Sequence, residues 1–382
     1  MRWRKEDIPQ FIPSPANGYA LDWDQLGELF PVLAKLERVP QDPEYHKEGD
    51  VLTHTRMVVE CLTDDPEWRQ LPDTDRAELW LGTLLHDIGK LKTTEIRDDG
   101  RISSRNHTAI GARMGRELIW MHPELSIPFP SRERIAGYIR HHGLPVWILE
   151  KKDPVQIVRL TSQLIFMQQL YLLSRNDMKG RISSGIKQKL ESVDLFRDFC
   201  REQHCLDTPY PFADEVTRFL YAKNGKRDPS SPAYDDSKME VILLSGLPAA
   251  GKDTWIHRHG GNMEVVSLDT LRQAMGVDPA GNQGRVVQAA HKQAREYLAK
   301  GTPFIWNATN VTRQLRDPLI TLFRQYKARV RLVYVECPYR ELFRRNAERP
   351  DPVPETVIRK LIHKLEVPEP FEAHRVDYVV ES

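Results

Sequence analysis

The sequence has little cysteine, little net charge and no long apolar run. Its 382 residues include 4 cysteines, which form no Cys-x-x-Cys pair and are too few for a disulfide framework. No stretch approaches the roughly 20 apolar residues of a membrane span, and the N-terminus does not resemble a signal peptide. Lys and Arg total 55 against 54 Asp and Glu, so no overall basic field favours binding along duplex DNA. The sequence therefore predicts a cytoplasmic protein without a membrane partner, which holds any nucleic acid locally; its oligomeric state stays open.

The length and the apolar pattern predict two domains. A helix is expected over residues 22–37, and helical spacing recurs from residue 51 to about residue 221, so residues 1–222 are predicted to be all-α. Residues 223–238 are polar and interrupted by Gly and Pro, which is typical of a linker. Residues 239–382 are predicted to form an α/β domain with a parallel sheet, because helical stretches alternate with short apolar runs at 241–244, 265–267, 304–306 and 330–335.

Histidine and aspartate residues interrupt the apolar faces of several predicted helices in the first domain. His54, for example, shares a face with Val58 and Cys61. A polar group pointed into a core is costly unless it is satisfied, and a mixed His/Asp cluster suits divalent metals such as Mn²⁺, Co²⁺, Ni²⁺, Fe²⁺, Cu²⁺ or Zn²⁺. Each histidine could instead be a hydrogen-bonded core residue, but the number of interrupted helices favours a shared site. The candidate ligands are His54, His86, Asp87, His107, His141, His142 and Asp177.

The second domain begins with a phosphate-loop pattern at residues 246–252, Gly-Leu-Pro-Ala-Ala-Gly-Lys. A predicted strand precedes it and a predicted helix follows, so loop amides and a helix N-terminus would cradle phosphates while Lys252 reaches the outer ones. Asp253 replaces the usual Ser or Thr ligand of Mg²⁺, and either Asp253 or Thr254 is a candidate for that role. The strand and helix argue against a coincidental glycine turn. The predicted NTP-binding residues of this loop are Gly246, Pro248, Ala250, Gly251, Lys252, Asp253 and Thr254.

Two further pairs of charged residues suggest where an acceptor binds. Asp269 and Arg272 follow a predicted strand at a helix start, so one can take a proton from an attacking hydroxyl while the other orients a phosphate. The alternative is an N-cap aspartate with a solvated arginine. Arg345 and Arg349 are predicted to share one helical face, as they also would on an ion-paired surface helix.

Residues 45–185 resemble the HD superfamily of metal-dependent phosphohydrolases. The resemblance rests on His54, on His86-Asp87 followed by Ile-Gly-Lys, on the later histidines and on Asp177; residues 49–59 are also similar to the start of the HD domain in bacterial CCA-adding enzymes. It implies that His54, His86, Asp87 and Asp177 are core ligands, with His107, His141 or His142 completing a second metal position. Adjacent helical residues diverge by about 100°, so the sequence leaves the choice between the last two open. Lys90 would contact the phosphate, and bound metals would acidify water.

Residues 239–382 are similar to 5′-hydroxyl polynucleotide kinases of the phage and end-healing type. The resemblance rests on residues 246–254, Asp269 with Arg272, Thr309-Asn310, and Arg345 to Arg349 followed by Val353-Pro. It implies that Asp269 is the general base and that Arg272, Arg345 and Arg349 steady the nucleotide and the transferring phosphoryl group. Ala308 departs from the family pattern, which has an acidic residue there.

Together the two halves resemble the bacterial HD-Pnk family of bifunctional end-healing enzymes. The resemblance implies a kinase that uses ATP or another NTP with Mg²⁺ on 5′-OH ends of RNA or DNA. It also implies an HD domain that processes 2′,3′-cyclic or 2′-phosphate ends, and a functional link to a nucleic-acid ligase. The alternatives are a nucleotide or small-molecule kinase fused to a nucleotidase, and a regulatory module that binds nucleotides without hydrolysis. The second is disfavoured because a sensor needs no general base such as Asp269.

Overall fold

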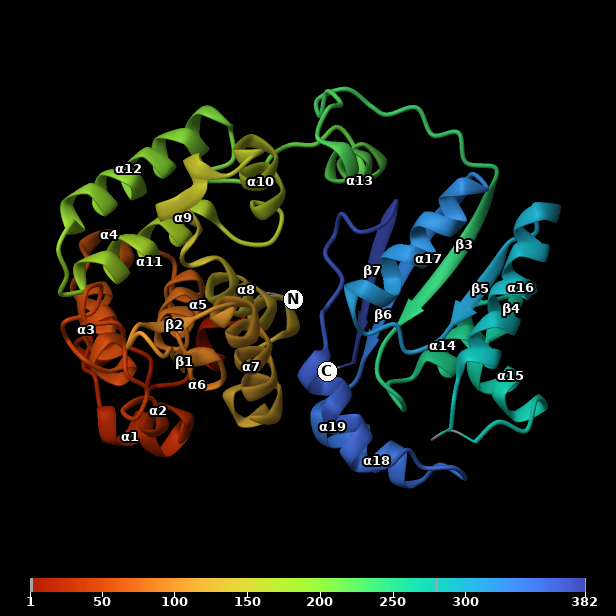
Figure 1. Cartoon of the computed structure of the whole chain (residues 1–382), viewed down its shortest axis with the longest axis horizontal. Helices are drawn as coiled ribbons and strands as arrows, with labels where there is room; N and C mark the ends of the chain where they lie inside the picture. Colours follow the sequence, from red (N-terminus) through yellow and green to blue (C-terminus); the bar gives the residue numbers. More distant parts are fainter. Residues whose placement is uncertain (1–2, 279–280, 382) are drawn as a thin grey trace. The chain divides into compact units, whose positions relative to one another are not determined.

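The computed structural model describes residues 3–278 and 281–381, and the chain divides into two compact units. The first unit is Met1–Pro211 and the second is Phe212–Ser382 (Figure 1). Within the described residues, no helix is long and apolar enough to cross a membrane.

The first unit is a helical domain, as predicted. Helices α3, α5, α8 and α11 pack on one another, and α7 and α12 cover α8 and α11. Their shared core includes the fully buried side chains of Trp80, Tyr138 and Leu170. The helices are α1 (Trp23–Leu29), α2 (Val32–Leu36), α3 (Val51–Asp64), α4 (Pro66–Arg69), α5 (Asp73–Leu84), α6 (Lys90–Thr93), α7 (His107–Met121), α8 (Phe129–His141), α9 (Leu144–Trp147), α10 (Pro154–Thr161), α11 (Met167–Lys179) and α12 (Ile186–Glu202), with short 3₁₀ turns η1 (Lys5–Asp7), η2 (Pro15–Asn17), η3 (Pro123–Leu125) and η4 (Ile148–Glu150).

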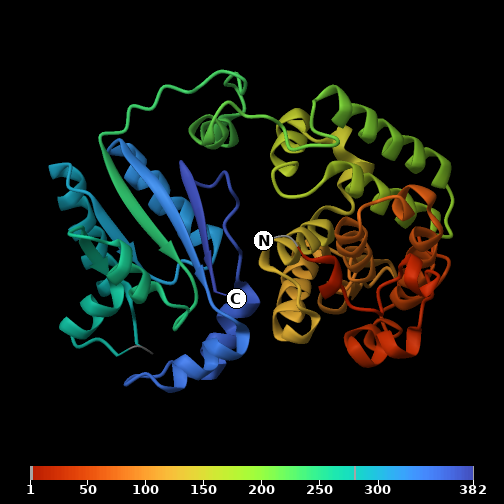
Figure 2. The ribbon, with the colours of Figure 1, turned by 180° about the vertical axis from the view of Figure 1, so that it is seen from behind.

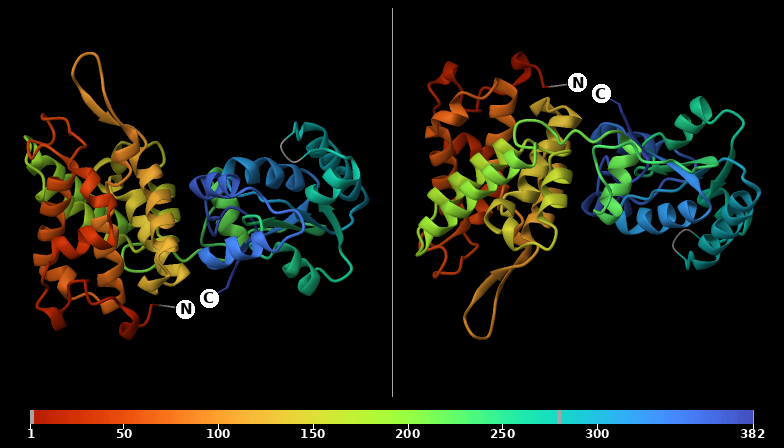
Figure 3. Two further views of the ribbon diagram at one scale, coloured as in Figure 1. Left: turned by 90° about the horizontal axis from the view of Figure 1, so that it is seen from below. Right: turned by 90° about the horizontal axis from the view of Figure 1, so that it is seen from above.

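Two details of this unit differ from the sequence prediction. The helix expected over residues 22–37 is two helices, because α1 ends before Pro31 and α2 begins after it. Proline has no N–H to donate and disfavours helical geometry in the preceding residue. The unit also contains an antiparallel hairpin, β1 (Thr94–Ile96) and β2 (Ile102–Ser104), which extends away from the helices (Figure 3). Gly100 supports its tip with a φ of +78°, a conformation that glycine adopts without strain.

The second unit has a parallel five-stranded sheet in the order β4-β5-β3-β6-β7, seen from the other side in Figure 2. Its strands are β3 (Met239–Ser245), β4 (Glu264–Ser267), β5 (Phe304–Asn307), β6 (Ala328–Glu336) and β7 (Arg375–Val380), and its helices are α13 (Glu215–Asn224), α14 (Lys252–His259), α15 (Leu268–Ala274), α16 (Gly284–Lys300), α17 (Arg313–Gln325), α18 (Tyr339–Ala347) and α19 (Glu355–Lys364). Alternate residues of the strands face opposite sides: Leu243 packs with α16 and α17, while Leu244 packs with Trp255 of α14. Helices on both faces explain the continuous apolar runs of the central strands.

Strand β7 and helix α13 differ from the sequence prediction. The sequence analysis missed β7, an edge strand whose alternating pattern is short and half exposed. Helix α13, which the predicted boundary at residue 222 assigned to the first domain, belongs to the second: Phe219 is fully buried there, with its ring centroid 4.5 Å from that of His374. Residues 223–238 also contact the second unit, because Asp235 pairs with Arg329 at 2.7 Å. Local periodicity cannot tell which core a helix joins.

Candidate functional site

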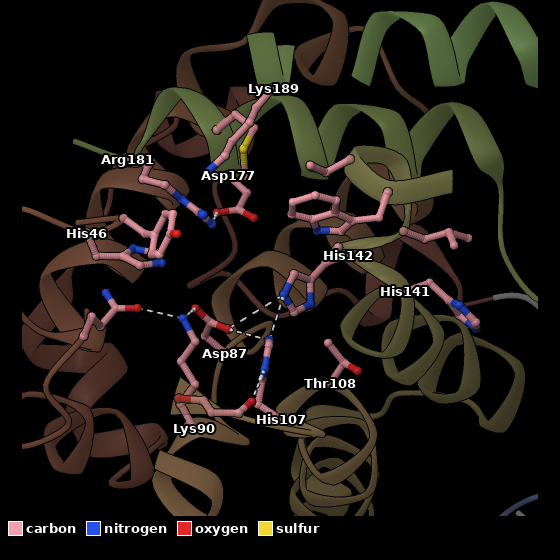
Figure 4. A pocket seen from close by; sticks show the side chains of 18 of the residues that line it. His46, Asp87, Lys90, His107, Thr108, His141, His142, Asp177, Arg181 and Lys189 are labelled. Atoms are coloured by element: carbon pink, nitrogen blue, oxygen red, sulfur yellow. Dashed lines mark hydrogen bonds and ion pairs between the residues drawn. The ribbon is translucent and has the colours of Figure 1, made fainter. Parts of the chain in front are cut away.

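Four of the predicted metal ligands, Asp87, His107, His142 and Asp177, line a cavity of about 840 Å³ (Figure 4). His54 and His86 lie behind them, next to Asp177 and Asp87. His54 lies on α3 and Asp177 on α11, while His107 is the first residue of α7. Contrary to the helical reading, His86 and Asp87 lie in the turn between α5 and α6, and His142 directly follows α8. The side chains of His54, His86, Asp87 and Asp177 are at most 3% exposed, so the cluster is sheltered from bulk water.

The cluster has two halves joined by Asp87. His54 Nε2 lies 3.1 Å from Asp177 Oδ1, and His86 completes this first half with all three ligand atoms within 4.8 Å of one another. His107 Nε2 and His142 Nε2 lie 3.5 and 3.8 Å from Asp87 Oδ1 and form the second half with it. The other Asp87 oxygen, Oδ2, lies 3.3 Å from His86 Nε2. Asp87 therefore belongs to the second three-residue group and contacts the first through Oδ2, and each group is suited to a divalent cation.

Hydrogen bonds at the far side of the rings orient the histidines. Nδ1 of His86, His107 and His142 lies 2.8, 2.7 and 2.9 Å from the carbonyl oxygens of Thr83, Ser104 and Ile139. A carbonyl oxygen only accepts, so Nδ1 carries the proton and Nε2 presents its lone pair to the cluster. Within the described chain, His54 Nε2, His86 Nε2 and Asp87 Oδ1 are buried without a hydrogen-bond partner. Buried polar atoms of this kind fit a bound metal.

The charges of the cluster also suit a cation. Burial lowers the pKa of His142 to about 3, so that ring is neutral. Burial raises the pKa of the Asp87 carboxyl, but Lys90 and His86 outweigh it and hold that pKa well below its usual range. Burial likewise lowers the pKa of His86, whereas Asp87 and Asp177 raise it above its usual value. The neutral ring of His142, the ionised carboxylate of Asp87 and the field of Asp87 and Asp177, which attracts positive charge to His86, all favour a bound cation.

Two cations border the cluster. Lys90 Nζ lies 2.7 Å from Asp87 Oδ2 and donates at 2.7 Å to Gln41 Oε1, and Arg181 donates to Asp177 Oδ1 at 2.9 Å. Both side chains line the cavity, so each can reach an anionic ligand next to the metal positions. Lys90 was predicted from the sequence, but Arg181 was not. The position of Arg181, four residues after Asp177, was the available signal.

The structure separates the two adjacent histidines. His142 belongs to the metal-ligand group, whereas His141 lines the cavity outside it, with its ring turned away from the cluster (Figure 4). Sequence reasoning also missed His46 and Glu48, a buried pair behind His54. Glu48 Oε1 lies 2.9 Å from His54 Nδ1 and 2.8 Å from His46 Nδ1, so it fixes the tautomer of the ligand. Their proximity to His54 in the sequence was the available signal.

Gly89 sets the distance between the two segments that carry the cluster. A Cβ atom at this position would lie 2.0 Å from the carbonyl oxygen of His107 and 2.6 Å from the Gly111 nitrogen. The turn that carries His86 and Asp87 thus touches the backbone of α7 directly. Glycine is required here for space, since its backbone φ of −64° is ordinary.

The predicted phosphate loop of the second unit connects β3 to α14. Gly246 passes so close to β6 that a Cβ atom would lie 2.4 Å from the Val335 carbonyl oxygen, and Gly251 has a φ of +104°. Lys252 Nζ donates to the carbonyl oxygens of Gly246 and Leu247 at 3.0 and 2.8 Å. Burial lowers the pKa of Lys252 to about 8, although Asp253 and Asp269 raise it. Pro248 and Ala250 lie within this loop, as expected from their sequence positions.

The predicted metal-binding and acceptor-binding residues of this unit lie near the loop. Asp253 Oδ1 accepts a hydrogen bond of 2.7 Å from Asn307, which orients the carboxylate, while Thr254 is exposed without such support. Asp269, on α15, forms an ion pair with Arg272, so the two side chains share a face of the helix, and the N-cap of α15 is Ser267. The Asp269 side chain is 68% exposed, and a partner substrate can therefore approach it.

The two later arginines are not on one helix. Arg345 lies on α18 and pairs with Glu341 at 2.6 Å and Glu381 at 2.5 Å, with one guanidinium nitrogen 3.6 Å from where a Cβ of Gly251 would be. Arg349 lies in the turn beyond the end of α18, so the predicted shared helical face is wrong. The side chain of Asn346 holds the chain beyond the helix. Its Nδ2 donates to the carbonyl oxygen of Val353 at 2.8 Å, and its Oδ1 accepts from the Val353 N–H at 3.0 Å.

Comparisons with known proteins match a different family to each half of the chain. An HD-domain family model matches residues 51–165, and an AAA-domain model matches residues 241–368. The L-seryl-tRNA(Sec) kinase of Methanococcus maripaludis is 23% identical over 135 residues, 34% of this chain and 53% of that protein. The multifunctional CCA protein of Hahella chejuensis is 32% identical over 99 residues, 25% of this chain and 20% of that protein. The chain thus spans about half, or less, of the curated relatives that it matches.

Solved structures give weaker likenesses. A sugar kinase from Janibacter sp. HTCC2649 has a TM-score of 0.30 and 16% identity, covering 37% of this chain and 85% of that one. A gluconokinase from Sinorhizobium meliloti 1021 has a TM-score of 0.27 and 16% identity, covering 38% and 83%. Scores this low carry no argument about function. The family matches show that the chain joins an HD domain to an AAA domain that contains the phosphate loop.

Proposed function

We propose that the chain is a bifunctional nucleic-acid end-healing enzyme. Its second unit transfers the γ-phosphate of an NTP to 5′-OH ends, and its first unit hydrolyses 2′,3′-cyclic phosphate or 2′-phosphate ends. The observation that carries the proposal is the pairing of two complete sites for phosphate chemistry in one chain. One has inward-facing histidine nitrogens around Asp87, and the other has Asp269 and Lys252 at a phosphate loop. Removing phosphate from one end and adding it to the other leaves termini that a ligase can seal.

In the first unit, His54, His86, Asp87, His107, His142 and Asp177 would hold divalent metal. Such a metal acidifies bound water and stabilises charge on phosphoryl oxygens. Lys90 and Arg181 are placed to bind the non-bridging oxygens of the phosphate. Burial of the cluster excludes bulk water, which strengthens these electrostatic interactions.

In the second unit, Lys252 would leave its carbonyl partners to bind the outer phosphates, and Asp253, oriented by Asn307, would offer an oxygen ligand to Mg²⁺. Asp269 accepts the proton of the attacking 5′-hydroxyl. Arg272, Arg345 and Arg349 steady the nucleotide and the charge on the transferring group. The proton moves to an exposed carboxylate, from which it exchanges with solvent.

The main rival is a nucleotide or small-molecule kinase fused to a nucleotidase. An RNA-borne acceptor is supported by the name of one similar protein, L-seryl-tRNA(Sec) kinase, but that name specifies a seryl group and not a 5′ end. A purely regulatory module is disfavoured by the retention of an acid-base group and a full ligand set.

One experiment separates these readings. The full chain is incubated with a 5′-OH oligonucleotide that ends in a 2′,3′-cyclic phosphate, together with NTP, Mg²⁺ and Mn²⁺, and both ends are measured by mass spectrometry. End healing adds 80 Da at the 5′ end for one phosphoryl group and hydrates or removes the 3′-terminal phosphate. Phosphorylation of free nucleosides with no change in the oligonucleotide would favour the rival.

A further inference from the structure

The rim of the metal cavity carries a large exposed aromatic side chain. Trp147 lines the cavity and is 48% exposed, whereas Trp68 and Trp80 of the same unit are fully buried. Burying an indole ring is strongly favourable, so an exposed one at a cavity is a feature that needs an explanation. The cavity, at about 840 Å³, is also much larger than a single phosphate group requires.

One short segment connects this tryptophan to the metal cluster. His142 is followed by α9, which ends at Trp147, and by η4 and Lys151. The segment is held in place by Pro145 and Ile148, which are buried, so its exposed side chains are presented on a fixed backbone. The position of Trp147 relative to His142 is therefore set by the fold.

Two cations line the same cavity as Trp147. Arg140 and Lys151 both line the cavity, and within the described residues neither has an acidic partner within 4 Å. Arg140 donates to the hydroxyl of Thr108 at 2.9 Å, which leaves its charge available. An aromatic ring and cations without acidic partners that line one cavity are features by which proteins bind single-stranded nucleic acid, because bases stack on the ring while cations contact the phosphates.

We propose that Trp147 forms a stacking subsite for the terminal base of a single-stranded polynucleotide, with Lys151 and Arg140 binding the phosphate preceding it. This inference rests on the proposed function of the first unit and deepens it. The terminal phosphate lies at the metal cluster, and the base next to it stacks on the indole. The subsite is indifferent to base identity, since every base offers a π-face.

The test is a double-mutant cycle between protein and oligonucleotide. Binding of a fluorescent oligonucleotide that ends in a 2′-phosphate to the full chain is measured by anisotropy in EDTA, which prevents hydrolysis. A second oligonucleotide of equal length lacks the terminal base. Trp147→Ala is expected to weaken binding of the first about 5- to 150-fold and of the second less than about 2-fold, and Trp147→Phe to restore most of the loss. Leu149→Ala is the matched control, because Leu149 is 53% exposed in the same segment but does not line the cavity.

A salt titration tests the cations. Lys151→Gln is expected to lower the slope of log Kd against log salt by about 0.7, the value for one phosphate contact on a single strand. Equal losses for both oligonucleotides in Trp147→Ala would overturn the stacking subsite while leaving end healing intact. If the unmodified protein hydrolyses p-nitrophenyl phosphate but neither binds nor hydrolyses oligonucleotide ends, both the subsite and the proposed function fall.

Discussion

The two candidate sites differ in how their charged groups are held. In the first unit the ligand nitrogens of His54 and His86 face the cluster without hydrogen-bond partners, and their rings are fixed from behind. In the second unit the principal cations contact the protein itself: Lys252 binds loop carbonyls and Arg345 pairs with Glu341 and Glu381. The histidine nitrogens of the first site are preorganised for a metal ion, whereas Lys252 and Arg345 of the second site must exchange internal partners for phosphate oxygens.

The difference teaches how each site relates to its ligand energetically. A preorganised metal site loses little freedom when it binds, so its affinity depends on the groups that hold the ligands still. In a site with internal ion pairs, the binding free energy is the difference between the interactions gained with the ligand and the internal interactions lost. Removing an internal partner can therefore increase the affinity for the ligand. The following variants test this contrast.

The largest effect is expected from Lys252→Ala or Asp269→Ala. Phosphorylation of 5′-OH ends should fall about 10²- to 10⁴-fold, since phosphate binding or proton removal is lost, with phosphoesterase activity unchanged. Rates of both reactions are measured on one protein preparation. Lys292→Ala, on the exposed side of α16, is the control. Full kinase activity in Asp269→Ala would rule it out as the base.

Next in size is the pair His142→Ala and His141→Ala. The first should lose one metal equivalent and at least about 100-fold in hydrolysis, because a ligand is removed. The second should retain both, since His141 lies outside the ligand group. Elemental analysis and hydrolysis rates check each variant. The reverse pattern would show that the wrong histidine has been placed in the cluster.

Glu48→Gln tests preorganisation directly. It keeps the shape of the side chain but removes the charge behind His54, so metal affinity should fall about 10- to 100-fold. Competition with a chelator gives the affinity, and circular dichroism checks the fold. Glu44→Gln, a nearby exposed residue, serves as the control. If metal affinity does not change, the orientation of His54 does not depend on this carboxylate.

Glu381→Gln tests the opposite behaviour in the second unit. Without this partner, Arg345 loses one internal ion pair and can bind phosphate more readily. The KM for NTP should therefore fall about 2- to 5-fold, which corresponds to the free energy of one exposed ion pair. Steady-state kinetics measure it. Glu355→Gln breaks the exposed pair with Arg359 on α19 and should leave the KM as it was. An increased KM for Glu381→Gln means that this pair positions Arg345 for catalysis.

The smallest effect is expected from separating the units. Fragments 1–211 and 212–382 each contain their own core and site, so each should retain the activity of its half. A cut at residue 222 should instead harm the second fragment, because it removes most of α13 and buried Phe219. Fragments that fold but work only when mixed would show that the two sites share an interface.

The sequence predicted the parts whose signal is local. The order of strand, glycine loop and helix at Lys252, and the His86-Asp87 pair, are patterns of adjacent residues, and the structure contains both. It could not predict which of His141 and His142 enters the cluster, because that depends on where α8 ends. Nor could it predict Asn307, whose role arises from a contact with Asp253, 54 residues away in the sequence.

Gly89 bears on how this metal site can change over evolution. The spacing of the two halves of the cluster is set by one backbone resting on another, and no side chain at this contact can be trimmed or enlarged to adjust it. Small changes of side-chain size at this contact therefore cannot adjust the distance between the turn that carries Asp87 and the start of α7 that carries His107. A different spacing requires α7 to shift as a whole, which makes position 89 intolerant of substitution although its residue has no side chain to offer the metal.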